Sequence, residues 1–220
     1  MPKRAVIFDM DGVLTDSEPI HTDAYRILFR KLGIEISEER HHSFVGYSNR
    51  VMWMELRQEF NLAPSVDELL AMGNQNICAW FENLEQLPIV PGVEDFLKQL
   101  VHRKFRLGIA SSSPKKLIQL IVHKLDFDSY FPVTVSGEDV ACGKPAPDIF
   151  LTAAMRLKVP AAECLVIEDS PHGIAGARAA GMSSVGFVNP NSGNQDLSHA
   201  DLQIHDFSAK SVATIFRLLD

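Results

Sequence analysis

The sequence predicts an α/β fold, in which a doubly wound parallel sheet carries an all-helical segment inserted after the first strand. After residue 105, short apolar runs rich in β-forming residues alternate with apolar residues at helical spacing. This alternation implies right-handed crossovers, parallel strands and helices on both faces of the sheet. The second observation is that residues 17–88 show helical spacing without a convincing strand, which predicts the insertion.

The first apolar run, Ala5–Phe8, predicts a fully buried strand. Strand–helix alternation resumes with a helix at 93–100, directly after Pro91-Gly92. We therefore expect an α/β catalytic core of residues 1–16 and 89–220, with residues 17–88 as a helical cap. An insertion at the ligand-binding end of a sheet is well placed to act as a lid.

The later elements follow in order. Apolar runs predict further strands at 107–110, 133–135, 165–167, 185–188 and 202–204. Helical spacing predicts helices at 115–125, 149–157 and 174–180. Pro147 suits the start of the second of these helices, and Gly181 suits the end of the third.

Composition excludes several classes of protein. The 220 residues are 46% hydrophobic and 22% charged, which fits a globular protein of one or two domains. The 21 basic and 28 acidic residues give a net charge of −7 without a dense basic cluster, so we expect no nucleic-acid partner. No apolar run approaches the roughly 18 residues of a membrane span. We therefore expect no membrane partner.

The cysteines and the N-terminus suggest a compartment. Cys78, Cys142 and Cys164 are scattered and odd in number, which argues against a disulfide framework or a zinc site. Residues 1–4 lead straight into the first strand, so they do not resemble a signal peptide. We expect reduced thiols in a cytoplasmic protein.

Two carboxylates, Asp9 and Asp11, directly follow the first strand and precede Gly12. Ionised carboxylates at the end of a buried strand are costly unless a cation or substrate offsets their charge. Glycine lets the chain turn and lets a ligand approach closely. In open α/β sheets, ligands bind outside the carboxyl ends of the strands. The alternative is an ordinary surface turn.

Three later features fit the same kind of site. Ser111, Ser112 and Ser113 follow a buried strand and open a helix, as an anion site or an ordinary N-cap would. Lys144 lies in a loop stiffened by Pro145 and Pro147, although a solvated lysine is the commoner case. Glu168-Asp169 form a second acidic pair at a strand end. Together these are the parts of a Mg²⁺-dependent phosphoryl-transfer site.

The chain resembles, along essentially its whole length, the haloacid dehalogenase superfamily of phosphohydrolases with a small helical cap. The resemblance rests on four motifs that occur in the family's order: residues 9–18, residues 110–113, residues 144–148 and residues 167–170. It implies a Rossmann-like core. It also implies a cis peptide bond between Lys144 and Pro145.

The resemblance also implies residue roles. Asp9 would be the nucleophile that becomes an aspartyl-phosphate, and Asp11 the general acid and base. Mg²⁺ would be held by Asp9, the main-chain carbonyl of Asp11, Asp169 and nearby Glu168. Lys144, Ser111 and the main-chain amide of Ser112 would bind the phosphate, and Lys144 would also offset the charge of Asp9.

An acid at position 11 points to phosphate esters, because relatives that cleave other bonds lack it. The favoured hypothesis is a phosphatase that acts on a sugar phosphate or another small phosphorylated metabolite. We expect the protein to be a monomer or a weak dimer. The alternative is a β-phosphoglucomutase, and a third is a non-catalytic protein that binds a phosphorylated ligand. Candidate specificity residues are Ser17, His21, Asn49, Arg50 and Ser113.

Some residues of the helical insertion favour the mutase hypothesis and others argue against it. Ser17 and His21 match the mutase-like hinge. Asn49 stands where mutases carry a cap arginine, in the turn Gly46–Arg50, and Arg50 comes one place later. A second basic cap position falls within residues 77–81, which hold no Lys or Arg. His41 and His42 match no motif and are expected at the surface, and Trp53 and Trp80 are expected in the core of the cap.

Overall fold

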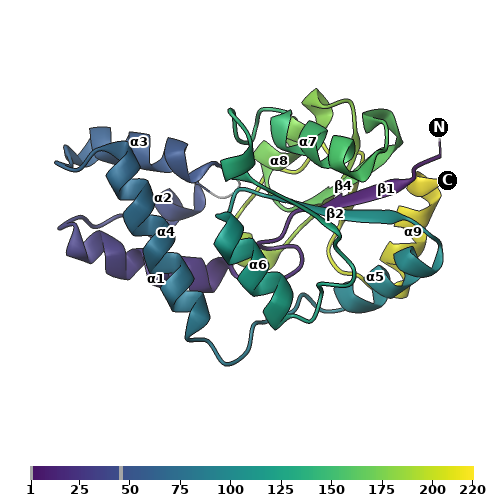
Figure 1. Ribbon diagram of the computed structural model, residues 1–220, viewed down its shortest axis with the longest axis horizontal. Coiled ribbons are helices and arrows are strands. Elements are labelled where there is room, and N and C mark those ends of the chain that lie inside the picture. The colour runs from purple at the N-terminus through teal and green to yellow at the C-terminus, as the bar shows by residue number, and fades with distance from the viewer. Residues whose placement is uncertain (1, 45–46) are drawn as a thin grey trace.

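The computed structural model describes residues 2–44 and 47–220 and shows an α/β lobe beside a helical lobe (Figure 1). The described strands form one parallel sheet of six strands in the order β3-β2-β1-β4-β5-β6. They are β1 (Ala5–Phe8), β2 (Arg106–Ser111), β3 (Val133–Ser136), β4 (Cys164–Glu168), β5 (Ser183–Phe187) and β6 (Leu202–Ile204). The predicted parallel, Rossmann-like sheet is confirmed. β1 and β6 match their predicted bounds, and β2, β3 and β4 extend one residue further at one or both ends, whereas β5 begins two residues and ends one residue earlier than predicted.

Helices cover both faces of this sheet (Figure 1). One face carries α5 (Val93–His102), α6 (Lys115–Lys124) and α9 (Ala209–Leu219), and the other carries α7 (Asp148–Leu157) and α8 (Pro171–Ala179). Short 3₁₀ turns are η1 (Gly137–Asp139), η2 (Ala161–Glu163) and η3 (Pro190–Ser192). Successive side chains of a strand point to opposite faces, so β1 contributes to both cores.

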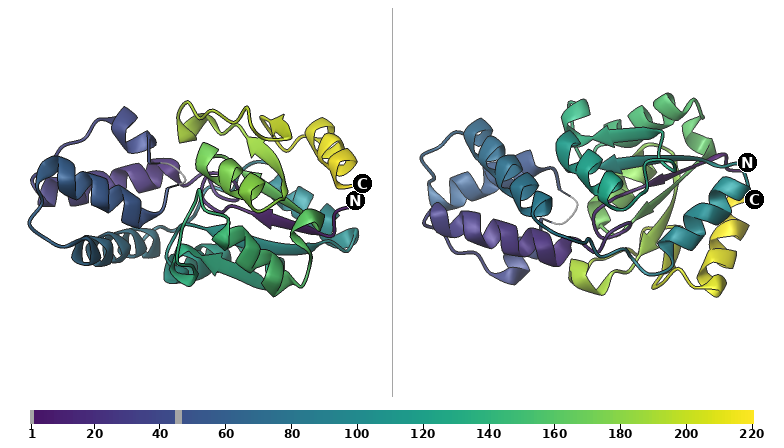
Figure 2. Two further views of the ribbon diagram at one scale, coloured as in Figure 1. Left: turned by 90° about the horizontal axis from the view of Figure 1, so that it is seen from above. Right: turned by 60° about the horizontal axis from the view of Figure 1, so that its bottom comes forward.

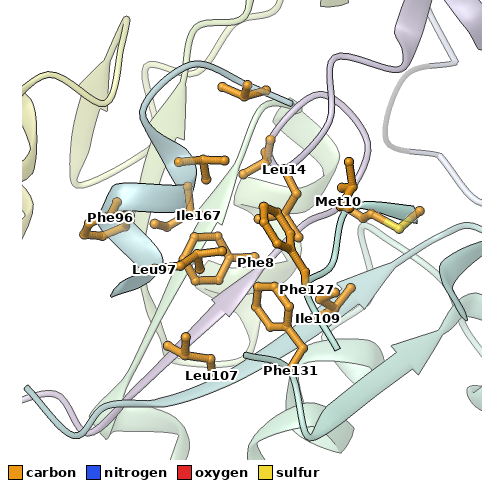
Figure 3. Close-up of a cluster of buried hydrophobic side chains, with 14 of the residues drawn as sticks. Phe8, Met10, Leu14, Phe96, Leu97, Leu107, Ile109, Phe127, Phe131 and Ile167 are labelled. Carbon is orange, nitrogen blue, oxygen red and sulfur yellow. The ribbon is translucent and has the colours of Figure 1, made fainter. Parts of the chain in front are cut away.

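The two cores show this alternation. Val6 and Phe8 join the core under α5, α6 and α9, whereas Ala5 and Ile7 join the core under α7 and α8. The Phe8 ring lies edge-on to the rings of Phe96 and Phe131, at centroid distances of 6.1 and 5.7 Å (Figure 3). β1 is therefore buried on both faces, as its uninterrupted apolar run predicts.

The segment between β1 and α5 forms the helical lobe (Figure 2). It contains α1 (Glu18–Lys31), α2 (Glu38–His42), α3 (Asn49–Phe60) and α4 (Val66–Glu82), and no strand is found among its described residues. The lobe has its own apolar cluster, in which Trp53 is fully buried. Trp80 is half-buried and packs against the larger apolar cluster, which also includes Ile77 and Phe81 of this lobe.

The two segments that connect the lobes run side by side. The Thr15 hydroxyl donates a hydrogen bond to the carbonyl oxygen of Pro88 at 2.8 Å, and the Asp16 amide donates to the same oxygen at 2.9 Å. Both connections leave the α/β lobe at the carboxyl ends of the strands, where β1 ends. A helical segment attached in this way faces the ligand-binding edge of the sheet.

Two helices, α2 and α9, go beyond the predicted elements. The sequence carried a signal for α9, because the buried residues Val212, Ile215, Phe216 and Leu219 recur at helical spacing. The described helices include none that is long and apolar enough to cross a bilayer.

Candidate active site

The candidate site lies where three neighbouring strands end. Phe8 of β1 pairs with Ile109 of β2 on one side and with Ile167 of β4 on the other. Just beyond these paired residues lie Asp9 after β1, Ser111 at the end of β2 and Glu168 at the end of β4. Parallel pairing therefore brings three of the four sequence motifs to one edge of the sheet.

Lys144 comes to this edge from the loop before α7, through a cis peptide bond to Pro145, as the resemblance predicts. Its ammonium donates hydrogen bonds to Oδ1 of Asp9 at 2.6 Å and to Oε1 of Glu168 at 2.5 Å. All three side chains are buried. Although burial opposes it, the two carboxylates raise the pKa of Lys144, which keeps the ammonium charged.

Three carboxylates surround the same point. Ligand atoms of Asp9, Glu168 and Asp169 lie within 4.8 Å of one another, and all three residues are buried. Burial raises the pKa values of Asp9 and Asp169 well above their ordinary range, and repulsion from Glu168 adds to this effect. Because Lys144 supplies one positive charge against three carboxylates, the donor set fits a hard divalent cation such as Mg²⁺.

The turn after β1 is fitted tightly around Asp169. Gly12 has a φ of +76°, and a Cβ at this position would lie 1.9 Å from Oδ2 of Asp169. Both the backbone conformation and the close approach therefore require glycine. On the other side of the turn, the Asn189 side chain donates a hydrogen bond to the Gly12 carbonyl at 2.8 Å.

The Asp11 carboxylate is not part of the three-carboxylate cluster, although it lines the same cleft. Its Oδ1 accepts hydrogen bonds from the Ser17 hydroxyl at 2.7 Å and from Nε2 of His21 at 2.9 Å, and its Oδ2 accepts from the Ser113 hydroxyl at 2.8 Å. Although burial opposes it, these partners lower the pKa of Asp11 to about 2. Asp11 in turn raises the pKa of His21, again against burial, so the pair shares one proton that resides on the imidazole.

The serine run forms a tight turn between β2 and α6. The Ser111 hydroxyl accepts a hydrogen bond from the Ser113 amide at 3.0 Å, and the Ser113 carbonyl accepts one from the Ser136 hydroxyl at 2.6 Å. The Ser112 hydroxyl is buried, and it has no hydrogen-bond partner among the residues described. A buried polar atom at the edge of the cleft, without a partner in the chain, suits a ligand that supplies one.

A cleft separates this edge from the helical lobe. The α/β lobe lines it with Asp9, Asp11, Ser111, Ser112, Ser113, Lys144 and Asp169, and the helical lobe with Glu18, His21, Tyr25, His41, Phe44, Tyr47, Asn49 and Met52. The lobes also touch beside the cleft, where the rings of Tyr47 and His172 lie 3.8 Å apart between centroids.

The candidate specificity residues divide into three groups. His21, Asn49 and Ser113 line the cleft, whereas Ser17 is fully buried behind Asp11. Arg50 is not among the lining residues that the structure describes, and its guanidinium pairs with Asp67 at the surface, at 2.7 Å. Gly46, in the same turn, lies outside the described residues.

The expectation for His41 is wrong. His41 is buried between α1 and α2, with its ring 5.9 Å from the Tyr25 ring and 6.3 Å from the Phe29 ring. Aromatic residues of α1 bury it, and the polar sequence around it gives no sign of this contact. The side chain of His42 lies outside the described part of the chain.

Sequence reasoning missed several residues of the site. Ser192 donates a hydrogen bond to Oδ2 of Asp169 at 2.5 Å, from the turn after β5. Glu18 is the last residue of the first motif and lines the cleft, but sequence reasoning assigned it no role. A signal for Ser192 and Asn189 existed, because polar residues directly follow a predicted strand there as well.

Comparisons with known proteins identify the family to which the chain is similar. A family model described as haloacid dehalogenase-like hydrolase matches residues 3–181. A phosphorylated carbohydrates phosphatase of Thermotoga maritima is 33% identical over 82% of this chain and 83% of its own length. A β-phosphoglucomutase of Bacillus subtilis is 31% identical over 93% of this chain and 90% of its own. The crystal structure of a β-phosphoglucomutase from Clostridium difficile superposes with a TM-score of 0.84 at 26% identity, covering 98% of both chains.

Proposed function

This chain belongs to the haloacid dehalogenase-like hydrolases, and we propose that it is a Mg²⁺-dependent phosphatase that hydrolyses small phosphorylated sugars or similar monoesters. The observation that carries the proposal is the Asp9 carboxylate, which lies at the end of β1 within the cluster of Glu168 and Asp169 and against the Lys144 ammonium. Relatives named as phosphatases of phosphorylated carbohydrates support the substrate class.

The residues at the carboxyl edge of the sheet have three different roles in the proposed reaction. Asp9, Glu168 and Asp169, with the main-chain carbonyl of Asp11, would hold Mg²⁺, which when bound offsets the negative charge of the substrate. Lys144 remains protonated and orients the Asp9 carboxylate. The Ser111 and Ser112 hydroxyls would bind phosphate oxygens, and the unpartnered Ser112 hydroxyl is suited to this.

In the first step, a carboxylate oxygen of Asp9 attacks phosphorus and the ester P–O bond breaks. The leaving alkoxide takes a proton from Asp11, which receives it from His21 across their 2.9 Å hydrogen bond. In the second step, Asp11 accepts a proton from water as the water oxygen attacks the phosphorus. The bond between phosphorus and Asp9 then breaks, which releases inorganic phosphate and restores the carboxylate.

Mutase activity is the second candidate, and the Bacillus subtilis relative favours it. A mutase must hold a bisphosphate by its second phosphate, which calls for cations on the lobe side of the cleft. Among the described lining residues, however, no Lys or Arg comes from the helical lobe. Arg50, the nearest basic residue to the expected position, pairs with Asp67 instead. The geometry therefore supports release of phosphate to water.

Hydrolysis of p-nitrophenyl phosphate, with Mg²⁺ and with EDTA, tests the proposal. We expect turnover that requires Mg²⁺, and a loss of about a thousandfold or more in Asp9→Asn, which is nearly isosteric but has no anionic nucleophile. Activity of the variant within about tenfold of the wild type would exclude the covalent mechanism. Incubation with glucose 1-phosphate and a trace of its bisphosphate separates the candidates: a phosphatase releases phosphate, and a mutase releases glucose 6-phosphate.

A further inference from the structure

Glu18 is a buried carboxylate for which the proposed chemistry has no use. It is the first residue of α1, only 8% of its surface is exposed, and it lines the cleft from the helical-lobe side. Of the hydrogen bonds and ion pairs that the structure describes, none involves its side chain. It also lies outside the group of Asp9, Glu168 and Asp169 that could hold a metal ion.

An unpartnered carboxylate in this place costs stability. Burial raises the pKa of Glu18 to about 7, against the lowering effect of His21, and the carboxylates of Asp11 and Asp16 add to the rise. The chain therefore supplies more negative charge around Glu18 than positive charge. A side chain kept at such a cost, at the wall of a cleft, indicates a partner that arrives with the ligand.

The charges around the cleft limit what that partner is. A carboxylate repels phosphate, so Glu18 does not contact the phosphoryl group that Lys144 and the serine run are placed to bind. It faces the remainder of the substrate. A carboxyl group with a pKa near neutrality accepts a hydrogen bond from a hydroxyl in either protonation state, whereas pairing with an ammonium needs the ionised state.

We propose that Glu18 is a specificity-determining residue that accepts a hydrogen bond from a hydroxyl on the alcohol part of the substrate. The enzyme would thereby select monophosphates of polyhydroxylated alcohols over alkyl phosphates of the same length. This inference rests on the proposed phosphatase function for the placement of the phosphate. Asn49, on the same wall of the cleft, offers a second polar contact to such a substrate.

Binding measurements test the proposal without depending on turnover. Sorbitol 6-phosphate, hexyl phosphate and 6-aminohexyl phosphate are titrated calorimetrically, with Mg²⁺, into the Asp9→Asn protein and into the same protein carrying Glu18→Met or Glu18→Gln. We expect the Asp9→Asn protein with Glu18 intact to bind the sorbitol ester more tightly than the hexyl ester. Glu18→Met should reduce that ratio by about tenfold or more, the value of one hydrogen bond to a charged group, and Glu18→Gln should reduce it less.

The outcomes are distinct. An unchanged ratio in Glu18→Met overturns the proposal, and so does a preference for the aminohexyl ester that Glu18→Met abolishes. The ratio of kcat/KM for the same esters is also measured for the wild type and for Glu18→Met with Asp9 intact. The effect of Glu18→Met on this ratio should lie mainly in KM. If no ester is hydrolysed although the binding ratio changes, the phosphatase function fails and the assignment of Glu18 stands.

Thermal unfolding separates a binding role of Glu18 from a purely structural one, because the two roles predict opposite changes in the Tm of Glu18→Met. Removal of an unpaired buried carboxylate should raise the Tm of Glu18→Met, while the affinity for the sorbitol ester falls. A lowered Tm together with an unchanged binding ratio would assign Glu18 to the fold instead. Glu85→Gln, which removes an exposed carboxylate in the connection after α4, is the matched control and should change neither quantity.

Discussion

The Ser192 hydroxyl donates a hydrogen bond to Oδ2 of Asp169, and both side chains are buried beneath the turn that follows β1. This contact brings the carboxyl end of β5 into a site otherwise built from β1, β2, β4 and the Lys144 loop. The turn after β5 also supplies Asn189, whose side-chain amide donates hydrogen bonds to the Gly12 carbonyl and the Asp16 carboxylate. The η3 turn thus orients both the proposed metal ligand Asp169 and the backbone of the first motif.

Ser192→Ala should therefore weaken Mg²⁺ binding more than it weakens the fold. Loss of a hydrogen bond that orients a ligand typically costs 10–100-fold in metal affinity, and we expect at least about tenfold here. The hydrogen bond itself contributes about 1 kcal/mol to stability. Calorimetric titration with Mg²⁺ measures the first effect and urea unfolding the second. Ser192→Thr keeps the hydroxyl and should retain most of the affinity; equal weakening by both variants would contradict an orienting role.

Gly12→Ala should be far more harmful than Gly33→Ala. Both glycines have left-handed backbones, with φ of +76° and +73°, so alanine brings a similar backbone strain of about 1–2 kcal/mol at either site. Apart from the neighbouring residues in the chain, no atom lies within 4 Å of a Cβ added to Gly33, whereas at Gly12 the Cβ would meet Asp169. Urea unfolding should show an additional loss of at least about 2 kcal/mol for Gly12→Ala. Similar losses for the two variants would show that the turn relaxes around the methyl group.

The sequence predicted the sheet well because its signals are local. The run Ala5–Phe8 is apolar at every position, which is typical of a strand buried on both faces. The acidic pairs and the serine run were found for the same reason, since each directly follows a strand. Their convergence on one edge follows from parallel pairing alone, without any knowledge of the strand order.

The missed residues depend on contacts between distant segments. Ser192 reaches Asp169 because β5 lies next to β4, and no local pattern encodes that strand order. His41 lies in a stretch of charged and polar residues and is buried by aromatic rings of α1. Glu18 sits in a common position for an acidic residue, the first turn of a helix, so its local sequence gives no sign that it is buried.

The hydrogen bonds to Asp11 should make stability depend on acid pH. The pKa of Asp11 is about 2 in the folded protein, below its ordinary value of 3.8. A lowered pKa means that the ionised carboxylate stabilises the fold above about pH 4, and that this contribution disappears as the pH falls towards 2. Asp11→Asn lacks it at every pH. The difference in unfolding free energy between wild type and Asp11→Asn should therefore shrink by about 1 kcal/mol between pH 5 and pH 3.

Urea unfolding at the two pH values measures this difference. Three other buried carboxylates, Asp9, Glu18 and Asp169, have raised pKa values and favour the fold as the pH falls, but both proteins contain them and their effects largely cancel. A difference that stays constant, or that widens at pH 3, would show that Asp11 is not held as a carboxylate in the folded chain.

Asp11→Asn also tests the proton path from His21, through the identity of the leaving group. The amide that replaces the carboxylate cannot pass a proton to the departing oxygen, so sorbitol 6-phosphate should lose activity severely, by about a hundredfold or more. Nitrophenolate leaves with little need of a proton, so the rate of the p-nitrophenolate burst, which reports transfer of the phosphoryl group to Asp9, should fall far less. Rapid mixing is the proper measurement, because steady-state turnover also includes the second step, in which Asp11 serves as the base. Equal losses for the two esters in single-turnover experiments would remove Asp11 from the role of general acid.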